Sequence, residues 1–511
     1  MKEFERDASH PRGPGAAAVD QGLLYRRVAA ELRERIRSGV YLAGSRLPGV
    51  RRIAEEASVS LSTAIAAVRL LEDEGWIEAR ERSGFFVRRQ AVEDTTDRGG
   101  ADWRTPASIS GQSVTLNLLR ASSVARFGRL GVAMPDPAFL PVQPLQRAFR
   151  QTARWRSGDP VAYAFPPGLL ALRQQVSRRL ARAGCLAPPD RILITSGAQE
   201  AISLALRLLT RPGDIVAVES PTYYGLLQSM ETLGLQVLEV PADPEQGIRL
   251  PALRLALERW PVKACVLVPN HSNPIGYAMP EERKRALAGL LDEQGVPLVE
   301  DDVYGELGFH RDRPRTVQSY MKGPHWFLVG SASKIVSAGL RLGWLVTPAA
   351  HQEQAEYLQY TFDAGASTLD QFALAEYLAG GGLDRHLRRV RRDYAELTAR
   401  MAEFVVDRFP PGTRVNRPAG GYLLWVNGPE TLDALELYRR AIAHEIAIAP
   451  GPLFSAAGRY RNCFRLNAAV PWDGALETAL ATLAGLAHQV VAAASSADAA
   501  SPVDAASSVG A

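Results

Sequence analysis

The spacing of apolar residues differs between the two ends of the chain. Near the N-terminus, apolar residues recur every three or four positions and predict helices over residues 23–38, 50–57 and 61–74. Two short apolar runs, residues 76–79 and 85–88, follow and predict two strands joined by a glycine-containing turn. The pattern therefore indicates a small domain of three helices and a strand hairpin.

Three helices followed by a hairpin are the plan of the winged helix-turn-helix fold. The third helix begins with small polar residues, which suits insertion into the major groove of DNA. Within this helix we expect Ile65, Val68 and Leu71 to face the core. The residues expected on its outer surface are Ser62, Thr63 and Arg69.

Beyond residue 114 the period changes. Short, nearly continuous apolar runs alternate with helical patterns, as in a mostly parallel sheet covered by helices on both faces. The predicted strands are residues 191–195, 215–218, 236–239, 264–268, 297–299 and 327–329, and the predicted helices include residues 169–183, 199–209 and 224–233. A smaller C-terminal part carries a further strand over residues 462–467, so the expected fold class is α/β.

Polar groups stand directly after several of these strands. In open α/β sheets, ligands bind beyond the carboxyl ends of the strands, so we expect these groups to meet at one edge. The first of them is a turn of small residues that opens a helix, and such a turn suits a phosphate. The others are an aromatic face, an amide, a carboxylate, a phenol and an amine. In chain order they are Gly197, Ala198 and Gln199, then Tyr223, Asn273, Asp301, Tyr304 and Lys334.

Lys334 is the centre of this set. It follows the last predicted strand of the sheet, flanked by small residues, in a loop where an aldehyde could reach its amine. Ser331, Ser333 and Arg341 supply the hydroxyls and the cation that a phosphate ester requires. An aldehyde and a phosphate on one small molecule describe pyridoxal 5′-phosphate, which binds as a Schiff base to a lysine.

Charge and cysteine content limit the classes of function. Residues 21–90 contain 13 arginines against nine acidic residues, whereas the whole chain has a net charge of only +4, so the basic charge lies in the predicted DNA-binding domain. The three distant cysteines offer neither a disulfide framework nor the spacing of a metal site, which favours a reducing compartment. We expect no membrane span and no secretory signal, because the apolar runs are too short.

Composition also predicts the domain limits. We expect a disordered leader over residues 1–20, the winged domain over 21–90 and a linker over 91–113. The large domain is expected to span residues 114–490, and an Ala/Ser-rich disordered tail to span 491–511.

The first domain closely resembles the GntR family of DNA-binding domains. The matching segments include residues 44–51 (GSRLPGVR), 70–77 (LLEDEGWI) and 83–87 (SGFFV). The resemblance implies that the residues approaching DNA are Arg46, Arg51, Ser60, Ser62 and Thr63, with Gly84 at the tip of the wing. Gly49 and Leu61 depart from the family pattern, in which a hydroxyl residue and a polar residue are common.

The rest of the chain, residues 114–490, resembles the fold-type I pyridoxal-phosphate aminotransferases, with a seven-stranded type of sheet. The resemblance implies that Lys334 is the catalytic lysine and forms the internal aldimine, and that Asp301 faces the pyridine nitrogen. It also implies that Asn273 and Tyr304 bond the phenolic oxygen and that Tyr223 stacks on the ring. Asp302 and Tyr224 remain as rivals of Asp301 and Tyr223.

The same resemblance implies the remaining contacts. The phosphate would be held by Gly197, Ala198, Gln199, Ser331 and Arg341, with Ser333 contributing. Tyr163 would reach the phosphate of a partner subunit in a homodimer. Arg465, together with Asn273, would grip the α-carboxylate of a substrate, because an arginine forms a two-pronged pair with a carboxylate.

As a whole the chain resembles the MocR-type regulators, which join the two domains. We therefore expect a cytoplasmic, DNA-binding transcription regulator that senses an amino acid or amine through Lys334. One alternative is a working aminotransferase in which the DNA-binding domain is secondary. The other is a regulator that responds to pyridoxal phosphate itself.

Overall fold

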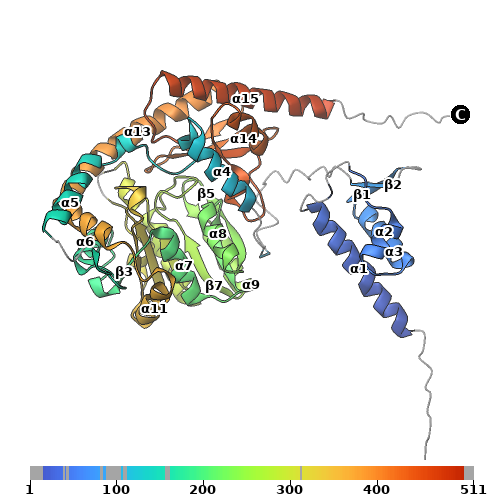
Figure 1. Cartoon of the computed structure of the whole chain (residues 1–511), viewed down its shortest axis with the longest axis horizontal. Helices are drawn as coiled ribbons and strands as arrows, with labels where there is room; N and C mark the ends of the chain where they lie inside the picture. Colours follow the sequence, from blue (N-terminus) through green and yellow to red (C-terminus); the bar gives the residue numbers. More distant parts are fainter. Residues whose placement is uncertain are drawn as a thin grey trace, which may run out of the picture. The chain divides into compact units, whose positions relative to one another are not determined.

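A computed structural model describes residues 15–37, 41, 45–80, 84–87, 105–106, 112–155, 161–310 and 313–499. The chain forms two compact units, residues 1–98 and residues 99–511. In Figure 1 the helices and strands of the first unit are blue, and those of the second run from teal to red.

The first unit is a three-helix domain with a hairpin. It contains α1 (Gly15–Arg37), α2 (Val50–Glu56), α3 (Leu61–Asp73), β1 (Ile77–Arg80) and β2 (Gly84–Val87). The two strands pair antiparallel, and one core made by all five elements lies between them and the helices. The winged helix-turn-helix prediction is confirmed. The leader prediction is wrong for residues 15–20, which belong to α1, while residues 1–14 lie outside the described residues.

Two side chains of α3 lie opposite to their predicted positions. The buried stripe of this helix is Ala64, Ala67, Val68 and Leu71. A stripe in that phase turns Ile65 outward, and its side chain is 39% exposed. Thr63 is only 6% exposed, because its hydroxyl lies 2.8 Å from that of the capping residue Ser60. The predictions that Ile65 faces the core and that Thr63 faces outward are therefore wrong, while the contact of Thr63 with DNA stays a prediction.

An eight-stranded sheet forms the centre of the second unit. Its order is β3 (Ile192–Thr195), β10 (Gly343–Val346), β9 (Trp326–Ser331), β8 (Leu298–Asp301), β7 (Val262–Leu267), β4 (Ile215–Ser220), β5 (Gln236–Asp243) and β6 (Gly247–Ile248). The strands from β9 to β5 pair in parallel, and β10 runs antiparallel between β3 and β9. The mostly parallel sheet is confirmed, but the two-residue edge strand β6 raises the strand number above seven.

Both faces of this sheet are buried. Along β4, Val216 and Val218 belong to one apolar core while Ile215 and Ala217 belong to another, because successive side chains of a strand point to opposite faces. Helices α7 (Ala198–Leu209), α8 (Tyr224–Thr232) and α11 (Gln352–Asp363) contribute to the first core, and α9 (Leu250–Arg259) and α10 (Glu281–Gln294) to the second. Figure 1 shows α7 and α8 lying across the sheet. Burial on both faces explains the near-continuous apolar strands.

The second unit also contains a smaller part built around a four-stranded antiparallel sheet. Its strand order is β11 (Arg414–Val415), β12 (Leu423–Asn427), β14 (Cys463–Asn467) and β13 (Ala449–Pro450). The remaining helices of the unit are α4 (Gln112–Val124), α5 (Val142–Trp155), α6 (Leu170–Ala181), α12 (Thr368–Ala379), α13 (Gly382–Arg408), α14 (Ala434–Ile442) and α15 (Gly474–Ala499). The long helix α13, orange in Figure 1, contributes to the cores of both the large and the small sheets.

Helix α15 departs from the sequence predictions. It continues to Ala499, so the predicted disordered tail is helical over residues 491–499. Residues 474–496 are long and apolar enough to cross a membrane by length and composition, with 39% of the apolar window buried. Leu476, Leu480 and Leu483 pack into the core of the smaller part, so we interpret α15 as a core helix.

Candidate functional site

A cavity of about 150 Å³ lies at the carboxyl ends of the parallel strands. It is formed by the first turn of α7, the end of β8, the turn after β9 and the loops that follow β4 and β7. The predicted site residues that line it are Ala198, Gln199, Tyr223, Asn273, Asp301, Tyr304, Ser331, Ser333, Lys334 and Arg341. The structure thus brings together residues that are separated by up to 143 positions in the chain, from Ala198 to Arg341.

Lys334 lies in the turn between β9 and β10. Because β10 runs back beside β9, this turn stands at the cavity edge of the sheet. The amine Nζ donates a hydrogen bond of 2.7 Å to the carbonyl oxygen of Ala133. Burial, and then the positive charge of Arg465, lower the pKa of Lys334 to about 8 from its usual 10.5. Roughly one tenth of this amine is therefore neutral and nucleophilic at pH 7, far more than for an ordinary lysine.

The structure separates the two adjacent aspartates. Asp301 lines the cavity, and its Oδ1 accepts a hydrogen bond from the Val303 amide, while Oδ2 accepts none from the described residues. Burial raises the pKa of Asp301 to about 7, and the nearby charge of Asp302 adds to the rise. Asp302 instead forms a buried 2.5 Å ion pair with Arg313 and accepts from Asn270. Asp301 is thus the carboxyl that can face a cationic ring nitrogen.

The two adjacent tyrosines also differ. Tyr223 lines the cavity, whereas Tyr224 is buried in the core of the smaller part with its ring centroid 5.6 Å from that of Phe454. A third tyrosine, Tyr304, presents a hydroxyl that is buried and has no hydrogen-bond partner of normal geometry among the described residues. An oxygen atom of a ligand would satisfy that hydroxyl.

Arg465 lies in β14 and is completely buried. Its guanidinium donates to Oδ1 of Asn273 at 2.9 Å and to the carbonyl oxygen of Gly131 at 2.8 Å, and it stacks on Phe454. Its Nε is buried without a partner, and its guanidinium forms no ion pair with a carboxylate of the described residues. Arg465 does not itself line the 150 Å³ cavity but stands directly behind Asn273, which does. A buried, unpaired guanidinium at this point suits an incoming carboxylate.

The first turn of α7 forms the other end of the cavity. Gly197 caps the helix with a φ of +101°, and a Cβ at this position would lie 2.5 Å from the guanidinium of Arg341. Arg341 donates to the carbonyl oxygen of Ser196 at 3.1 Å and remains exposed. The side-chain Nε2 of Gln199 donates to Gly225 and Ser229, so the donor that this residue can offer a phosphate is its backbone N–H.

This end has the properties of a phosphate site. Backbone N–H groups at a helix N-terminus attract an anion, and a cation stands beside them. The Ser331 and Ser333 hydroxyls lie 2.9 Å apart at the same cavity. Together with the phenol of Tyr304 and the carboxylate oxygen Oδ2 of Asp301, the arrangement fits the phosphate, oxygen and ring nitrogen of pyridoxal phosphate.

Tyr163 is the one cofactor residue that the fold does not bring near the cavity. Its side chain is 76% exposed and stacks on Phe165, with 5.2 Å between the ring centroids. Gly197 stands at the edge of the cavity, behind Arg341.

The predicted DNA-contacting residues lie in the first unit. Arg46, Arg51 and Ser62 are exposed. Gly84, with a φ of +95°, begins β2 and allows the guanidinium of Arg46 to lie against the wing. The hydroxyl of Ser60 accepts from the amide of Thr63 at 3.2 Å, so its role in the structure is to cap α3.

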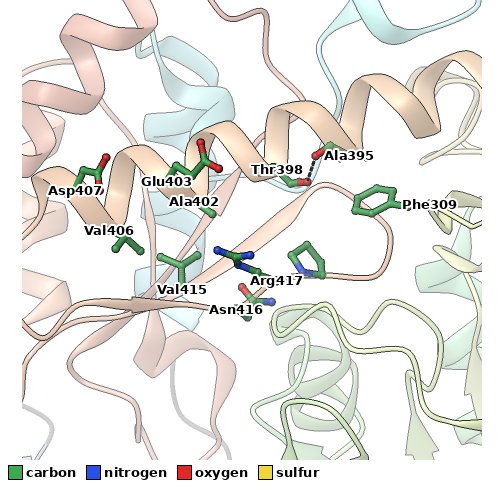
Figure 2. A pocket seen from close by; sticks show the side chains of 12 residues that line it. Phe309, Ala395, Thr398, Ala402, Glu403, Val406, Asp407, Val415, Asn416 and Arg417 are labelled. Atoms are coloured by element: carbon green, nitrogen blue, oxygen red, sulfur yellow. Dashed lines mark hydrogen bonds between the residues drawn. The ribbon is translucent and has the colours of Figure 1, made fainter.

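A larger hollow of about 390 Å³ lies between α13 and the segment around β11. Figure 2 shows Val406 of α13 and Val415 of β11 pointing toward one another there, with Arg417 nearby. None of the predicted site residues lines it. The volume of a hollow therefore does not identify the functional site, because the cavity that contains Lys334 is the smaller of the two.

Sequence reasoning missed part of the cavity wall, which also contains Met134, Ile202, Val268, Val303 and Ala338, and it missed two backbone acceptors. The carbonyl oxygens of Gly131 and Ala133 bond Arg465 and Lys334. Backbone acceptors leave no trace in side-chain patterns, so the sequence carries no signal for these two carbonyl oxygens.

Comparisons with known proteins agree with this geometry. Residues 136–483 match the family described as aminotransferase class I and II, and residues 24–87 match the bacterial regulatory proteins of the gntR family. An uncharacterized HTH-type transcriptional regulator of Escherichia coli K12, YjiR, is 37% identical over 89% of this chain and 97% of its own length.

Solved structures resemble the second unit. The kynurenine aminotransferase of Pyrococcus horikoshii, in complex with PMP, is 27% identical with a TM-score of 0.69, over 74% of this chain and 96% of its own. LysN, the α-aminoadipate aminotransferase of Thermus thermophilus, complexed with N-(5′-phosphopyridoxyl)-L-leucine, is 28% identical with a TM-score of 0.69, over 75% of this chain and 96% of its own.

The E. coli relative aligns with 89% of the chain and so with both units, and the aminotransferase family matches more than half of the chain. Pyridoxal phosphate is the cofactor of that family, and the cavity contains the groups that fit it. The chain accordingly belongs to the MocR-type GntR regulators, in which a DNA-binding winged helix-turn-helix is fused to an aminotransferase-like domain.

Proposed function

We propose that this regulator binds double-stranded DNA as a homodimer and that an amino acid bound in the cavity changes its affinity for DNA. The observation that carries the proposal is the guanidinium of Arg465. It is fully buried, it has no carboxylate partner among the described residues, and it stands behind Asn273 in the wall of the cavity that contains Lys334. The carboxylate of an amino acid would pair with this guanidinium, and its amine would then lie in the same cavity as Lys334.

The residues that would hold pyridoxal phosphate are those of the cavity. The α7 amides of Ala198 and Gln199, with Arg341, Ser331 and Ser333, would hold the phosphate, and Asp301, Tyr304 and Asn273 would hold the ring. When bound, the cofactor supplies an aldehyde that amines capture and a ring that withdraws electrons. The amine of Lys334 would attach it, and its pKa of about 8 keeps enough of the amine neutral for that step.

Two parts of the second unit meet at the proposed amino acid site. Arg465 belongs to the small sheet, while Asn273 follows β7 of the large sheet. A carboxylate that bonds Arg465 would compete with Asn273 for the guanidinium and would change how these two parts contact one another. Such a ligand shifts DNA affinity only if it binds two states of the protein unequally.

An exposed aromatic cluster supports the homodimer. The rings of Tyr163 and Phe165 stack, and Phe165 lies 6.2 Å from Tyr360. Val161 and Tyr357, 88% and 67% exposed, are also large apolar side chains near these residues in the chain. Exposed apolar groups gathered in this way are typical of interaction surfaces. The three free cysteines and the family relationship support a location in the cytoplasm.

The test uses the full-length protein loaded with pyridoxal phosphate and a duplex selected by that protein from a random 30-base-pair pool. DNA affinity is measured by fluorescence anisotropy with and without each of the twenty amino acids. We expect at least one to change the dissociation constant by fivefold or more, the lower end of ordinary allosteric coupling. Arg465→Met should abolish the change. Arg417→Met, which alters an exposed arginine of the same part, should not.

An affinity that stays constant for every amino acid, with the protein fully loaded, would refute the coupling. A second candidate function is transamination. It is favoured by the combination of a lysine with a pKa of about 8 and a buried aspartate in one cavity. Sustained formation of keto acid from an amino acid, with a second keto acid as acceptor, would support it.

A further inference from the structure

The outer face of α3 carries two large aliphatic side chains. Leu61 is 45% exposed and Ile65 is 39% exposed, and they stand one helical turn apart. Ser62 and Arg69 are exposed on the same side of the helix. This apolar pair, Leu61 and Ile65, lies in the N-terminal half of the helix that the fold presents for the major groove.

The domain core does not require the apolar pair. Ala64, Ala67, Val68 and Leu71 form the buried stripe of α3, and each of them is less than 9% exposed. Neither Leu61 nor Ile65 belongs to that core. Two solvent-exposed aliphatic side chains at the start of this helix therefore need an explanation outside the fold of the domain.

The surroundings of the pair favour a polyanion over a protein surface. Arg46, Arg51, Arg52 and Arg69 are all exposed in the same unit. In the major groove, only thymine presents an apolar group, the 5-methyl, and aliphatic side chains contact it. The side chains start roughly 6 Å apart along the helix axis, which corresponds to about two base-pair steps.

We propose that Leu61 and Ile65 contact the 5-methyl groups of two thymines, one or two steps apart in each half-site. This rests on the DNA binding proposed above and adds the base chemistry that this face selects. Arg46 and Arg51 would contact phosphates and set affinity without regard to sequence. The apolar pair would set the preference for thymine. This differs from the expectation that the serines at the start of α3 make polar contacts with the bases.

The experiment uses the full-length protein and the duplex that it selects from a random pool. Each thymine of that duplex is replaced in turn by uracil, which removes only the methyl group. We expect one or two replacements in each half-site to weaken binding about fourfold, the factor that corresponds to burial of one methyl-sized group. All other replacements should leave the dissociation constant unchanged.

Variants assign the effect to the apolar pair. Leu61→Ala and Ile65→Ala should each weaken binding to the thymine duplex and lose the response to uracil at their own position, so that the two changes are not additive. Because both side chains are substantially exposed, the unfolding temperature should remain unchanged. Leu255→Ala, which truncates an exposed leucine 46% accessible in the second unit, is the matched control and should alter neither property.

The outcomes separate the two proposals. A protein that selects a duplex but binds its uracil versions equally well would overturn the thymine contact and leave DNA binding intact. The thymine contact would also be overturned if Leu61→Ala and Ile65→Ala responded to uracil as the wild type does. If these variants instead changed the oligomeric state of the protein, the apolar pair would be assigned to a protein contact. If no duplex is enriched from the pool, DNA binding itself is wrong and the inference fails with it.

Discussion

A methyl group added at Gly197 tests the phosphate end of the cavity. The glycine has a φ of +101°, and a Cβ would lie 2.5 Å from the guanidinium of Arg341, closer than such atoms approach. Gly197→Ala therefore imposes two costs, a strained backbone and displacement of Arg341. Gly213→Ala is the matched control, because Gly213 has a φ of +90° but nothing within 4 Å of its Cβ position.

The backbone cost should be similar in both variants, about 1–3 kcal/mol. For a unit of roughly 400 residues, with an unfolding entropy of about 2 cal/mol/K per residue, this corresponds to a decrease of about 1–4 °C in unfolding temperature. Only Gly197→Ala should also disturb cofactor binding. Loss of one charge-assisted contact between Arg341 and the phosphate corresponds to a roughly 10- to 150-fold higher dissociation constant.

Equilibrium dialysis against pyridoxal phosphate, followed by absorbance, measures the dissociation constant, and differential scanning fluorimetry measures the unfolding temperature. We expect both variants to melt slightly earlier and only Gly197→Ala to lose affinity. Wild-type affinity in Gly197→Ala would show that neither the turn nor Arg341 holds the phosphate. An equal loss in Gly213→Ala would show that backbone strain alone explains the result.

Three further predictions concern the charged groups. Since the pKa of Lys334 is lowered to about 8, the neutral fraction of its amine increases from roughly one tenth at pH 7 to about nine tenths at pH 9. The rate at which the apoprotein captures pyridoxal phosphate should therefore rise about tenfold over this range and then level off. A rate that keeps rising toward pH ~10.5 would contradict the lowered pKa. Asp302→Asn breaks a buried ion pair with Arg313 and should lower the free energy of unfolding by about 3 kcal/mol or more, measured by urea denaturation. Asp301→Asn should unfold like the wild type and bind pyridoxal phosphate more weakly in a fluorescence titration, and the reverse pattern for the two variants would mean that their roles are exchanged. Lys334→Ala should retain no cofactor after borohydride reduction and peptide mapping, yet bind the selected duplex; label found at another lysine would refute the assignment.

Much of the fold follows from local patterns. Period-four apolar spacing predicted α2 and α3 to within a residue of their observed ends, and short apolar runs predicted the parallel strands. Strand β10 was not predicted, because it has only four residues and begins two residues after Arg341, beside a segment that was interpreted as a phosphate-binding loop. Helix ends were least predictable at α1 and α15, where alanine-rich segments of low complexity form helix.

The candidate site was predicted more completely in its side chains than in its backbone. Ten predicted residues line the cavity, but Tyr163 does not, because its side chain is exposed on the surface of the second unit. The carbonyl oxygens of Gly131 and Ala133 could not be predicted, since every residue offers the same acceptor. Thr63 and Ile65 were misplaced because a helical pattern defines a face only to within about one residue on either side.

The sequence by itself determined which chemical groups stand at the ends of the strands and that a basic helical domain precedes them. Those features depend on residue type and on periods of two and 3.6, which are local properties. Only the tertiary structure decided between Asp301 and Asp302 and between Tyr223 and Tyr224. Asp301 ends β8, whereas Tyr223 and Tyr224 begin α8. Which residue of each pair faces the cavity depends on how the sheet, Arg313 and the core around Phe454 pack together.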